Sequence, residues 1–418
     1  MSVTLNIVEV GARGDGVADE GGRRYFVPFS LPGEIVEAKP GEKRGEGIVA
    51  DLVEVVAPSR HRETPPCAHF TICGGCALQH WRFDVYTAWK VALIERALSQ
   101  RGVPMPAFEK PLAGTPGERR RVDYVLRRQG KRVLAGFHER GSAKVVDVGN
   151  CVIARPTLVA LLPPLRTALA DILPDGASAD AVANETDSGI DLLIRPHKRL
   201  ELTVDRRQAL VELAEKTGLA RLSWGGRGTA EPIVTRREPI LLLGEATVAV
   251  PPASFLQATK RAEQTMRAGV KAWLGAAARL ADLFAGVGAL TLGWPGKLAL
   301  YEGDAAAVAA ADAAARKRGD NKVVAERRDL FRNPLLASEL NAFDAVVLDP
   351  PRAGAAAQVA ELAQSKVKKI VYASCDPGSF ARDARVLHDG GYRLEKLMPI
   401  DQFLWSSHVE LIALFTRR

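Results

Sequence analysis

Cys375 stands where a cysteine can act as a nucleophile. It follows the apolar run 370–373 and Ser374, and it precedes Asp376 and Pro377. An apolar run that stops at a polar, proline-containing turn predicts a buried strand ending beside the cysteine. Ligands bind at the carboxyl ends of strands in open α/β sheets, so Cys375 is a candidate catalytic residue. The alternative is an inert core residue, because most free cysteines behave as small buried hydrophobic groups.

Four further cysteines have a spacing that suits a metal. Cys67, Cys73 and Cys76 form a C-x5-C-x2-C pattern, and Cys151 lies further along the chain. The total of five is odd and the N-terminus lacks the pattern of a secretory signal, so we expect no disulfide framework. Four thiolates suit either an iron–sulfur cluster or zinc. A zinc ribbon usually has a second C-x2-C pair, which this sequence lacks.

The C-terminal part has the pattern of a nucleoside-binding sheet. Strands and helices alternate from residue 251 onward, which is typical of a parallel sheet. A predicted strand over 279–284 leads into Gly286 and Gly288, and a second strand ends at Glu302, whose carboxylate can accept hydrogen bonds from ribose hydroxyls. The third glycine of the dinucleotide fingerprint is missing, so an adenosine cofactor without a pyrophosphate fits better.

Two more acids belong to the same predicted sheet. The strand over 342–348 ends in Asp349, within an Asp-Pro-Pro-Arg sequence, and Glu410 opens the last apolar strand. Glu410 is either a salt-bridged surface group or a residue of the pocket. In the pocket, apolar surroundings would raise its pKa towards that of a useful base.

The elements before this sheet predict two smaller units. Residues 3–58 contain short apolar strands with glycine and proline between them, which indicates a small β-barrel. The following segment has a helical pattern over 79–100 and a strand that begins with Arg119–Arg121. These arginines are either phosphate contacts or an ordinary solvated strand face. We therefore expect domains over 1–59, 60–246 and 247–418.

Composition limits the class of protein. Hydrophobic residues make up 47% and charged residues 25% of the chain, as in a soluble globular protein. No run of about 18 apolar residues occurs, so we expect no membrane span. The formal charge of +8 favours a polyanionic partner, although a mildly basic housekeeping enzyme would have the same charge.

Several motifs together resemble one family. D-L-F-x-G-x-G at 282–288, D-P-P-R-A-G at 349–354, Y-x-S-C-x-P at 372–377 and H-x-E at 408–410 follow one another in this order. With the cysteine pattern, they resemble the bacterial RNA uracil-5 methyltransferases, most closely the iron–sulfur-containing 23S rRNA branch. The resemblance covers nearly the whole chain, and residues 3–58 look like the TRAM barrel of that family.

The resemblance implies a multidomain α/β protein. Its parts would be an N-terminal TRAM-like RNA-binding β-barrel, a central α+β domain with a four-cysteine cluster site, and a C-terminal Rossmann-like class I methyltransferase domain. A [4Fe-4S] cluster would be held by Cys67, Cys73, Cys76 and Cys151. The protein would be a cytoplasmic monomer with RNA as its partner. Of the two RNA classes, 23S rRNA is favoured over tRNA.

The resemblance also assigns roles at the sheet. It implies S-adenosylmethionine as methyl donor, Cys375 as the nucleophile that attacks C6 of a uridine, and Glu410 as the base that removes the C5 proton. The positions that match the family's cofactor site are Gln257, Phe284, Gly286, Gly288, Glu302 and Asp349.

The sequence departs from the family pattern in two places, and rival interpretations remain open. Ala285 and Ala289 stand where the family usually has cysteine and asparagine, and residues 400–407 lack its usual P-H-T turn. One rival is a tRNA uridine methyltransferase. A second is an amino-group methyltransferase that uses the D-P-P sequence and would not need Cys375. A third is a non-catalytic RNA-binding assembly factor that has kept the fold.

Overall fold

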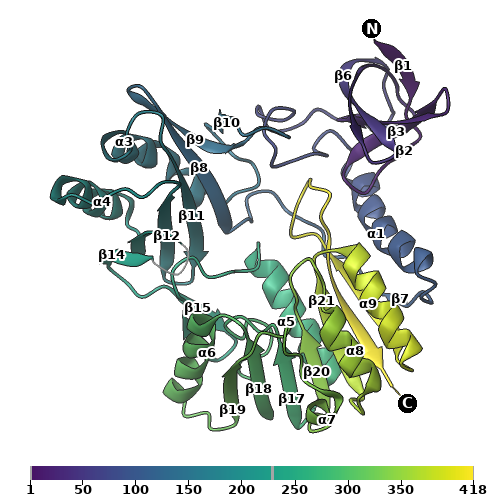
Figure 1. The fold of residues 1–418 in the computed structure, drawn as a ribbon, viewed down its shortest axis with the longest axis vertical. Coiled ribbons are helices and arrows are strands. Elements are labelled where there is room, and N and C mark those ends of the chain that lie inside the picture. Colours follow the sequence, from purple (N-terminus) through teal and green to yellow (C-terminus); the bar gives the residue numbers. More distant parts are fainter. Residues whose placement is uncertain (1, 227–229, 418) are drawn as a thin grey trace.

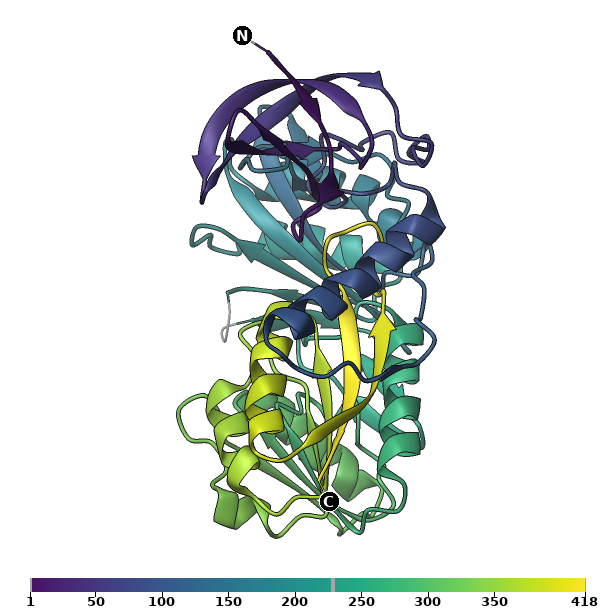
Figure 2. The same ribbon diagram turned by 90° about the vertical axis from the view of Figure 1, so that its right-hand side faces the viewer.

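The computed structural model describes residues 2–226 and 230–417. Along the chain it forms a curled N-terminal sheet, then a mostly antiparallel sheet with helices, then a mostly parallel sheet with helices on both faces (Figure 1). The C-terminal sheet lies at one end of the long axis, and the N-terminal and central sheets lie next to each other toward the other end (Figures 1 and 2). Within the described ranges, no helix is both long enough and apolar enough to cross a bilayer.

The N-terminal sheet has its own small core. Its strands pair in the order β1-β5-β6-β4-β3-β2, and Leu5, Val27 and Val36 are among the side chains buried inside it. Register shifts between β5 and β6 bend these long strands, so the sheet curls as a barrel-like unit requires. The strands are β1 (Val3–Asn6), β2 (Glu9–Val10), β3 (Asp15–Glu20), β4 (Arg23–Pro28), β5 (Ile35–Arg44) and β6 (Gly47–Ala57).

The central sheet is covered by helices with apolar stripes. Its strands pair in the order β10-β9-β8-β11-β12-β13-β14. Leu162, Leu165 and Leu169 recur at helical spacing on α3 and are buried. The elements of this part are β8 (Arg121–Gln129), β9 (Arg132–His138), β10 (Val145–Asp147), α2 (Pro156–Val159), α3 (Leu162–Ile172), β11 (Ser178–Thr186), β12 (Gly189–Pro196), α4 (Val204–Thr217), β13 (Arg221–Trp224) and β14 (Glu231–Thr235), followed by the hairpin β15 (Ile240–Leu243) and β16 (Ala246–Ala249).

The C-terminal sheet has the strand order β19-β18-β17-β20-β21-β23-β22-β7. The pairs from β19 to β21 are parallel, whereas β23 runs antiparallel to both of its neighbours. The elements are α5 (Lys260–Leu274), β17 (Arg279–Leu283), β18 (Lys297–Glu302), α6 (Ala305–Lys317), β19 (Val323–Arg327), α7 (Ala337–Leu340), β20 (Ala345–Leu348), α8 (Ala356–Gln364), β21 (Lys369–Ser374), α9 (Pro377–Asp389), β22 (Arg393–Ile400) and β23 (Glu410–Thr416).

Both faces of this sheet are buried, as its continuous apolar strands require. Successive residues alternate between two cores: Val346 and Tyr372 pack with α8 and α9, while Val347 and Val371 pack with α5 and α6. Helix α1 (Phe83–Gln100) contributes to the first core, and β7 (Ala107–Phe108) pairs with β22. The segment after the cysteine loop, expected in the central domain, thus extends the C-terminal sheet and its core.

Arg120 joins the central sheet to the C-terminal domain. Its guanidinium is 2% exposed and donates to Glu263 Oε2 of α5 (2.5 Å) and to the carbonyl oxygen of Gln257 (3.1 Å). Neither interpretation of Arg119–Arg121, as phosphate contacts or as a solvated strand face, holds for Arg120, whose charge is neutralised inside the protein. Arg119 and Arg121 are half-buried and line a cavity described below.

We expect Arg120→Met to lower the free energy of unfolding by about 3–5 kcal/mol, because it leaves the Glu263 carboxylate buried without its partner. The matched control is Arg385→Met, which breaks the exposed pair Arg385–Asp389 and should cost far less, because exposed ion pairs contribute little to stability. Urea unfolding followed by fluorescence compares the two variants. Equal losses would show that the Arg120–Glu263 pair does not hold the domains together.

Candidate active site

The carboxyl edge of the C-terminal sheet gathers the residues that the sequence singled out. Phe284 directly follows β17, Glu302 ends β18, Asp349 directly follows β20 and Cys375 directly follows β21. Since β23 is antiparallel to β21, its first residue, Glu410, lies at the same edge. The parallel order of the strands thus brings residues that are far apart in sequence to one place.

Cys375 and Glu410 lie on neighbouring strands. Ser374 of β21 pairs with Leu411 of β23, so Cys375 and Glu410 each come one position beyond this pair on the same side. Glu410 is buried, and Cys375 is half-buried. Burial, and next the Glu410 carboxylate, raise the pKa of the Cys375 thiol to about 12, against the opposite effect of Arg352. The free enzyme therefore holds this thiol protonated at neutral pH.

A chain of amide side chains connects these residues to Asp349. Gln257 donates from Nε2 to Asp349 Oδ2 (3.1 Å), and Gln402 donates from Nε2 to Gln257 Oε1 (2.8 Å) and to Glu410 Oε2 (2.7 Å). Sequence reasoning missed Gln402. Its position follows from the sheet topology: β22 is parallel to β21, so the polar residues after β22 fall at the same ligand-binding edge.

The carboxyl groups of the site ionise less readily than usual. Burial raises the pKa of Glu410 and of Asp349, and each is raised further by a neighbouring carboxylate, while the amide hydrogen bonds oppose the shift. Burial raises the pKa of Asp282 to about 7 although the Thr291 hydroxyl donates to it. Such shifts gather at functional sites, where burial and like charges are arranged for chemistry.

The glycine loop after β17 has room beside Glu302. Gly286 donates its backbone N–H to Glu302 Oε2 (2.9 Å), and Asp304 donates to Oε1 (2.9 Å). Both glycines have left-handed φ angles, 55° for Gly286 and 80° for Gly288. A Cβ on Gly288 would lie 2.9 Å from the Leu292 Cβ, whereas one on Gly286 would meet no protein atom within 4 Å. Gly288 is thus needed for packing, and Gly286 leaves open space at the acid.

The loop also has an anchor that compensates for its alanines. Arg267 of α5 donates to the carbonyl oxygens of Ala289 (2.6 Å) and Leu292 (2.9 Å). The backbone of this loop is therefore held from α5 without a polar side chain at position 289.

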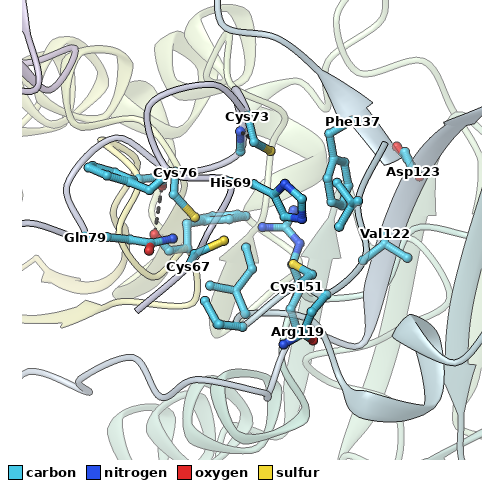
Figure 3. A pocket seen from close by; sticks show the side chains of 18 of the residues that line it. Cys67, His69, Cys73, Cys76, Gln79, Arg119, Val122, Asp123, Phe137 and Cys151 are labelled. Atoms are coloured by element: carbon cyan, nitrogen blue, oxygen red, sulfur yellow. Dashed lines mark hydrogen bonds between the residues drawn. The ribbon is translucent and has the colours of Figure 1, made fainter. Parts of the chain in front are cut away.

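The four cysteines Cys67, Cys73, Cys76 and Cys151 line one cavity of about 350 Å³ and point into it (Figure 3). The cavity extends to the catalytic edge, since Arg352 and His408 also line it. Among residues 2–226 and 230–417, no three histidine, cysteine or acidic side chains are placed so that they could hold a metal ion. The four-sulfur metal site therefore stays a prediction.

The segment before Glu410 is fixed from α1. Lys90 of this helix donates to the carboxylate of Asp401 and to the carbonyl oxygens of Phe403 (3.0 Å) and His408 (2.6 Å). Trp405, with a left-handed φ of 58°, occupies the turn that replaces the family's P-H-T sequence. The departure noted in the sequence is thus accommodated by an ordered turn.

Comparison with known proteins identifies the family. A family model described as tRNA (uracil-5-)-methyltransferase matches residues 320–418. An uncharacterized RNA methyltransferase of Brucella suis is 44% identical over 417 residues, which cover 99% of this chain and 97% of that protein. The 23S rRNA (uracil(1939)-C(5))-methyltransferase RlmD of Pectobacterium atrosepticum is 32% identical, with 99% of this chain and 93% of RlmD covered. The chain belongs to the RNA (uracil-5-)-methyltransferase family.

The family is an enzyme family, so this chain is an S-adenosylmethionine-dependent RNA uracil C5-methyltransferase, as the motifs predicted. Its fold is that of the Pyrococcus abyssi tRNA (uracil-54, C5)-methyltransferase, whose structure contains S-adenosyl-L-homocysteine. The TM-score is 0.76 at 22% identity, and 99% of each chain is covered. The predicted Rossmann-like C-terminal domain is confirmed.

We expect Glu302→Gln to weaken S-adenosylmethionine binding about 10- to 100-fold in calorimetry. The amide nitrogen cannot accept from a ribose hydroxyl, and it would face one of the backbone N–H groups that now donate to the carboxylate. Glu326→Gln is the matched control, because Glu326 is exposed on the neighbouring strand β19. Unchanged affinity in the Glu302 variant would mean that this acid does not contact the cofactor.

Proposed function

We propose that this enzyme methylates C5 of a uridine in 23S rRNA through a covalent bond between Cys375 and C6 of the base. The observation that carries the proposal is the pairing of β21 with β23, which puts the thiol beside the Glu410 carboxylate at the edge where Glu302 and Asp349 also lie. A nucleophile next to a buried acid is the arrangement that covalent catalysis followed by proton removal requires.

The chemistry explains why each residue type is needed. Uracil C5 is a poor nucleophile. When the Cys375 thiol gives up its proton to water, its sulfur adds to C6, and the ring becomes an enolate whose C5 carries the electron pair. Bound S-adenosylmethionine supplies the methyl group that C5 takes up. Glu410 then removes the C5 proton. The C5–H electron pair forms the C5=C6 double bond, and the C6–S bond breaks to release the Cys375 thiolate.

The charges around the thiol fit these steps. Arg352 lies at the mouth of the site and favours the thiolate form of Cys375, since its charge lowers the pKa of that thiol. The raised pKa of Glu410 makes it a better proton acceptor than an ordinary surface carboxylate. In the cofactor site, we assign Phe284, Gly286, Gly288, Glu302 and Asp349 to adenosine binding, with Gln257 beside them.

Sequence relatives support an RNA substrate of the ribosomal class. The full-length match to RlmD, at 32% identity, favours 23S rRNA, whereas the 22% match to the tRNA enzyme informs on the fold alone. The target uridine must leave the base stack to reach Cys375. We assign RNA binding to the N-terminal unit, 1–59, and to Arg119 and Arg121 of the central unit, 60–246, with catalysis in 247–418.

We also propose that the cysteine cavity holds a [4Fe-4S] cluster. The donor set consists of thiols from Cys67, Cys73, Cys76 and Cys151 around one cavity, and thiolates are the usual ligands of such clusters. No catalytic step is assigned to it.

The cluster makes a clear prediction. Protein purified without oxygen should be brown, with iron and sulfide in equal amounts, and Cys151→Ser should lose most of this colour. Cys375→Ser is the matched control and should keep it, because Cys375 lies outside the proposed ligand set. A colourless protein with stoichiometric zinc would contradict the assignment.

The methylation proposal is tested with labelled S-adenosylmethionine and separate 23S rRNA and tRNA pools from cells that lack the enzyme. We expect 5-methyluridine in 23S rRNA, none with Cys375→Ala, and a trapped protein–RNA adduct with Glu410→Gln. Loss of the general base should slow release of the adduct about 10²- to 10⁴-fold. Methylation of tRNA alone would show that the substrate is tRNA and not 23S rRNA. Full activity of Cys375→Ala would refute the covalent route.

A further inference from the structure

Gln402 is the centre of the polar network at the active site. Both the oxygen and the nitrogen of its amide group have hydrogen-bond partners. Its Oε1 accepts from the backbone N–H of Ala258 (2.8 Å), and its Nε2 donates to Gln257 and to Glu410. The side chain is 4% exposed. A buried amide with these partners cannot turn without losing several bonds at once.

The backbone contact fixes which way each amide points. A backbone N–H can only donate, so the atom of Gln402 that faces Ala258 must be the oxygen. The two hydrogens on Nε2 are then the ones given to Gln257 Oε1 and to Glu410 Oε2. Gln257 in turn must present its own nitrogen to Asp349. One main-chain group thus sets the polarity of the network.

We propose that Gln402 is a positioning residue for the proton-transfer step: it holds Oε2 of Glu410 and so leaves Oε1 as the atom that takes the C5 proton. This inference rests on the proposed role of Glu410 as the base. In the methylated adduct, the C5–H bond breaks, the proton goes to Oε1, and the electron pair forms the C5=C6 bond as the C6–S bond breaks.

Gln402 also affects how strongly Glu410 binds a proton. Its N–H stabilises the carboxylate and lowers the pKa of Glu410, against the larger effect of burial. The other charged or titratable groups that act on Glu410 or face it are Asp349, Arg352 and Cys375. Removal of the amide should therefore shift proton removal to higher pH, because Glu410 must be ionised to accept a proton.

Two substitutions separate this role from simple packing. Gln402→Met has a similar volume and removes the donors, whereas Gln402→Glu keeps an acceptor for Ala258 but places a carboxylate beside Glu410. We expect Gln402→Met to slow release of the methylated adduct about 10- to 100-fold, with little change in KM for RNA. The pH midpoint of release should rise in both variants, and further in Gln402→Glu because two carboxylates then repel.

Gln358→Met is the matched control. Gln358 is fully buried in α8 and exchanges two hydrogen bonds with the backbone of Leu335, away from the site. This variant should lose comparable stability but keep the wild-type pH midpoint and accumulate no adduct. The measurements are single-turnover release of adduct on denaturing gels across a pH series, and thermal unfolding of each variant.

The outcomes also separate this inference from the proposed function. If Gln402→Met and Gln402→Glu behave like Gln358→Met while Glu410→Gln still traps the adduct, the positioning role is wrong and the covalent route stands. If the wild type methylates RNA and neither it nor Glu410→Gln ever yields an adduct, the covalent route itself fails.

Discussion

A buried lysine holds the irregular segment on which the active site depends. Residues 401–409, between β22 and β23, belong to no helix or strand, yet they include Gln402 and lead into Glu410. Lys90 gives its ammonium hydrogens to the Asp401 carboxylate and to the carbonyl oxygens of Phe403 and His408. Burial lowers the pKa of Lys90 and Asp401 opposes this shift. Such a pair must stay intact, because either charge alone would be buried without compensation.

The same segment is bonded to the cysteine loop. The backbone N–H groups of Ala77 and Leu78 donate to the Trp405 carbonyl oxygen (2.8 and 3.0 Å). An apolar core that combines the N-terminal sheet, the cysteine loop, α1 and this segment includes Val10, Leu78 and Trp405. A shift of the cysteine loop must therefore move Trp405 or break these bonds. The conformation of the catalytic segment therefore depends on the conformation of the cysteine loop.

Local patterns were enough to predict the strand ends but not the contacts between distant segments. Cys375 and Asp349 could be placed because each follows a recognisable apolar run, and parallel strands bring such ends to one edge. Gln402 could not, since its importance depends on the pairing of β22 with β23. The Lys90–Asp401 pair joins residues 311 positions apart. Arg120 was misjudged because a strand pattern does not reveal which arginine meets a buried acid.

The electrostatics of the site also suit the order of the proposed steps. Asp282, Asp349 and Glu410 all have raised pKa values in the free enzyme, chiefly through burial. A positive sulfonium bound at this edge would lower these pKa values, as a nearby cation does for any carboxylate. In the proposed route, transfer of the methyl group to C5 would neutralise that positive charge and raise the pKa of Glu410 again. Glu410 would then be a stronger base at the step in which we propose that it removes the C5 proton.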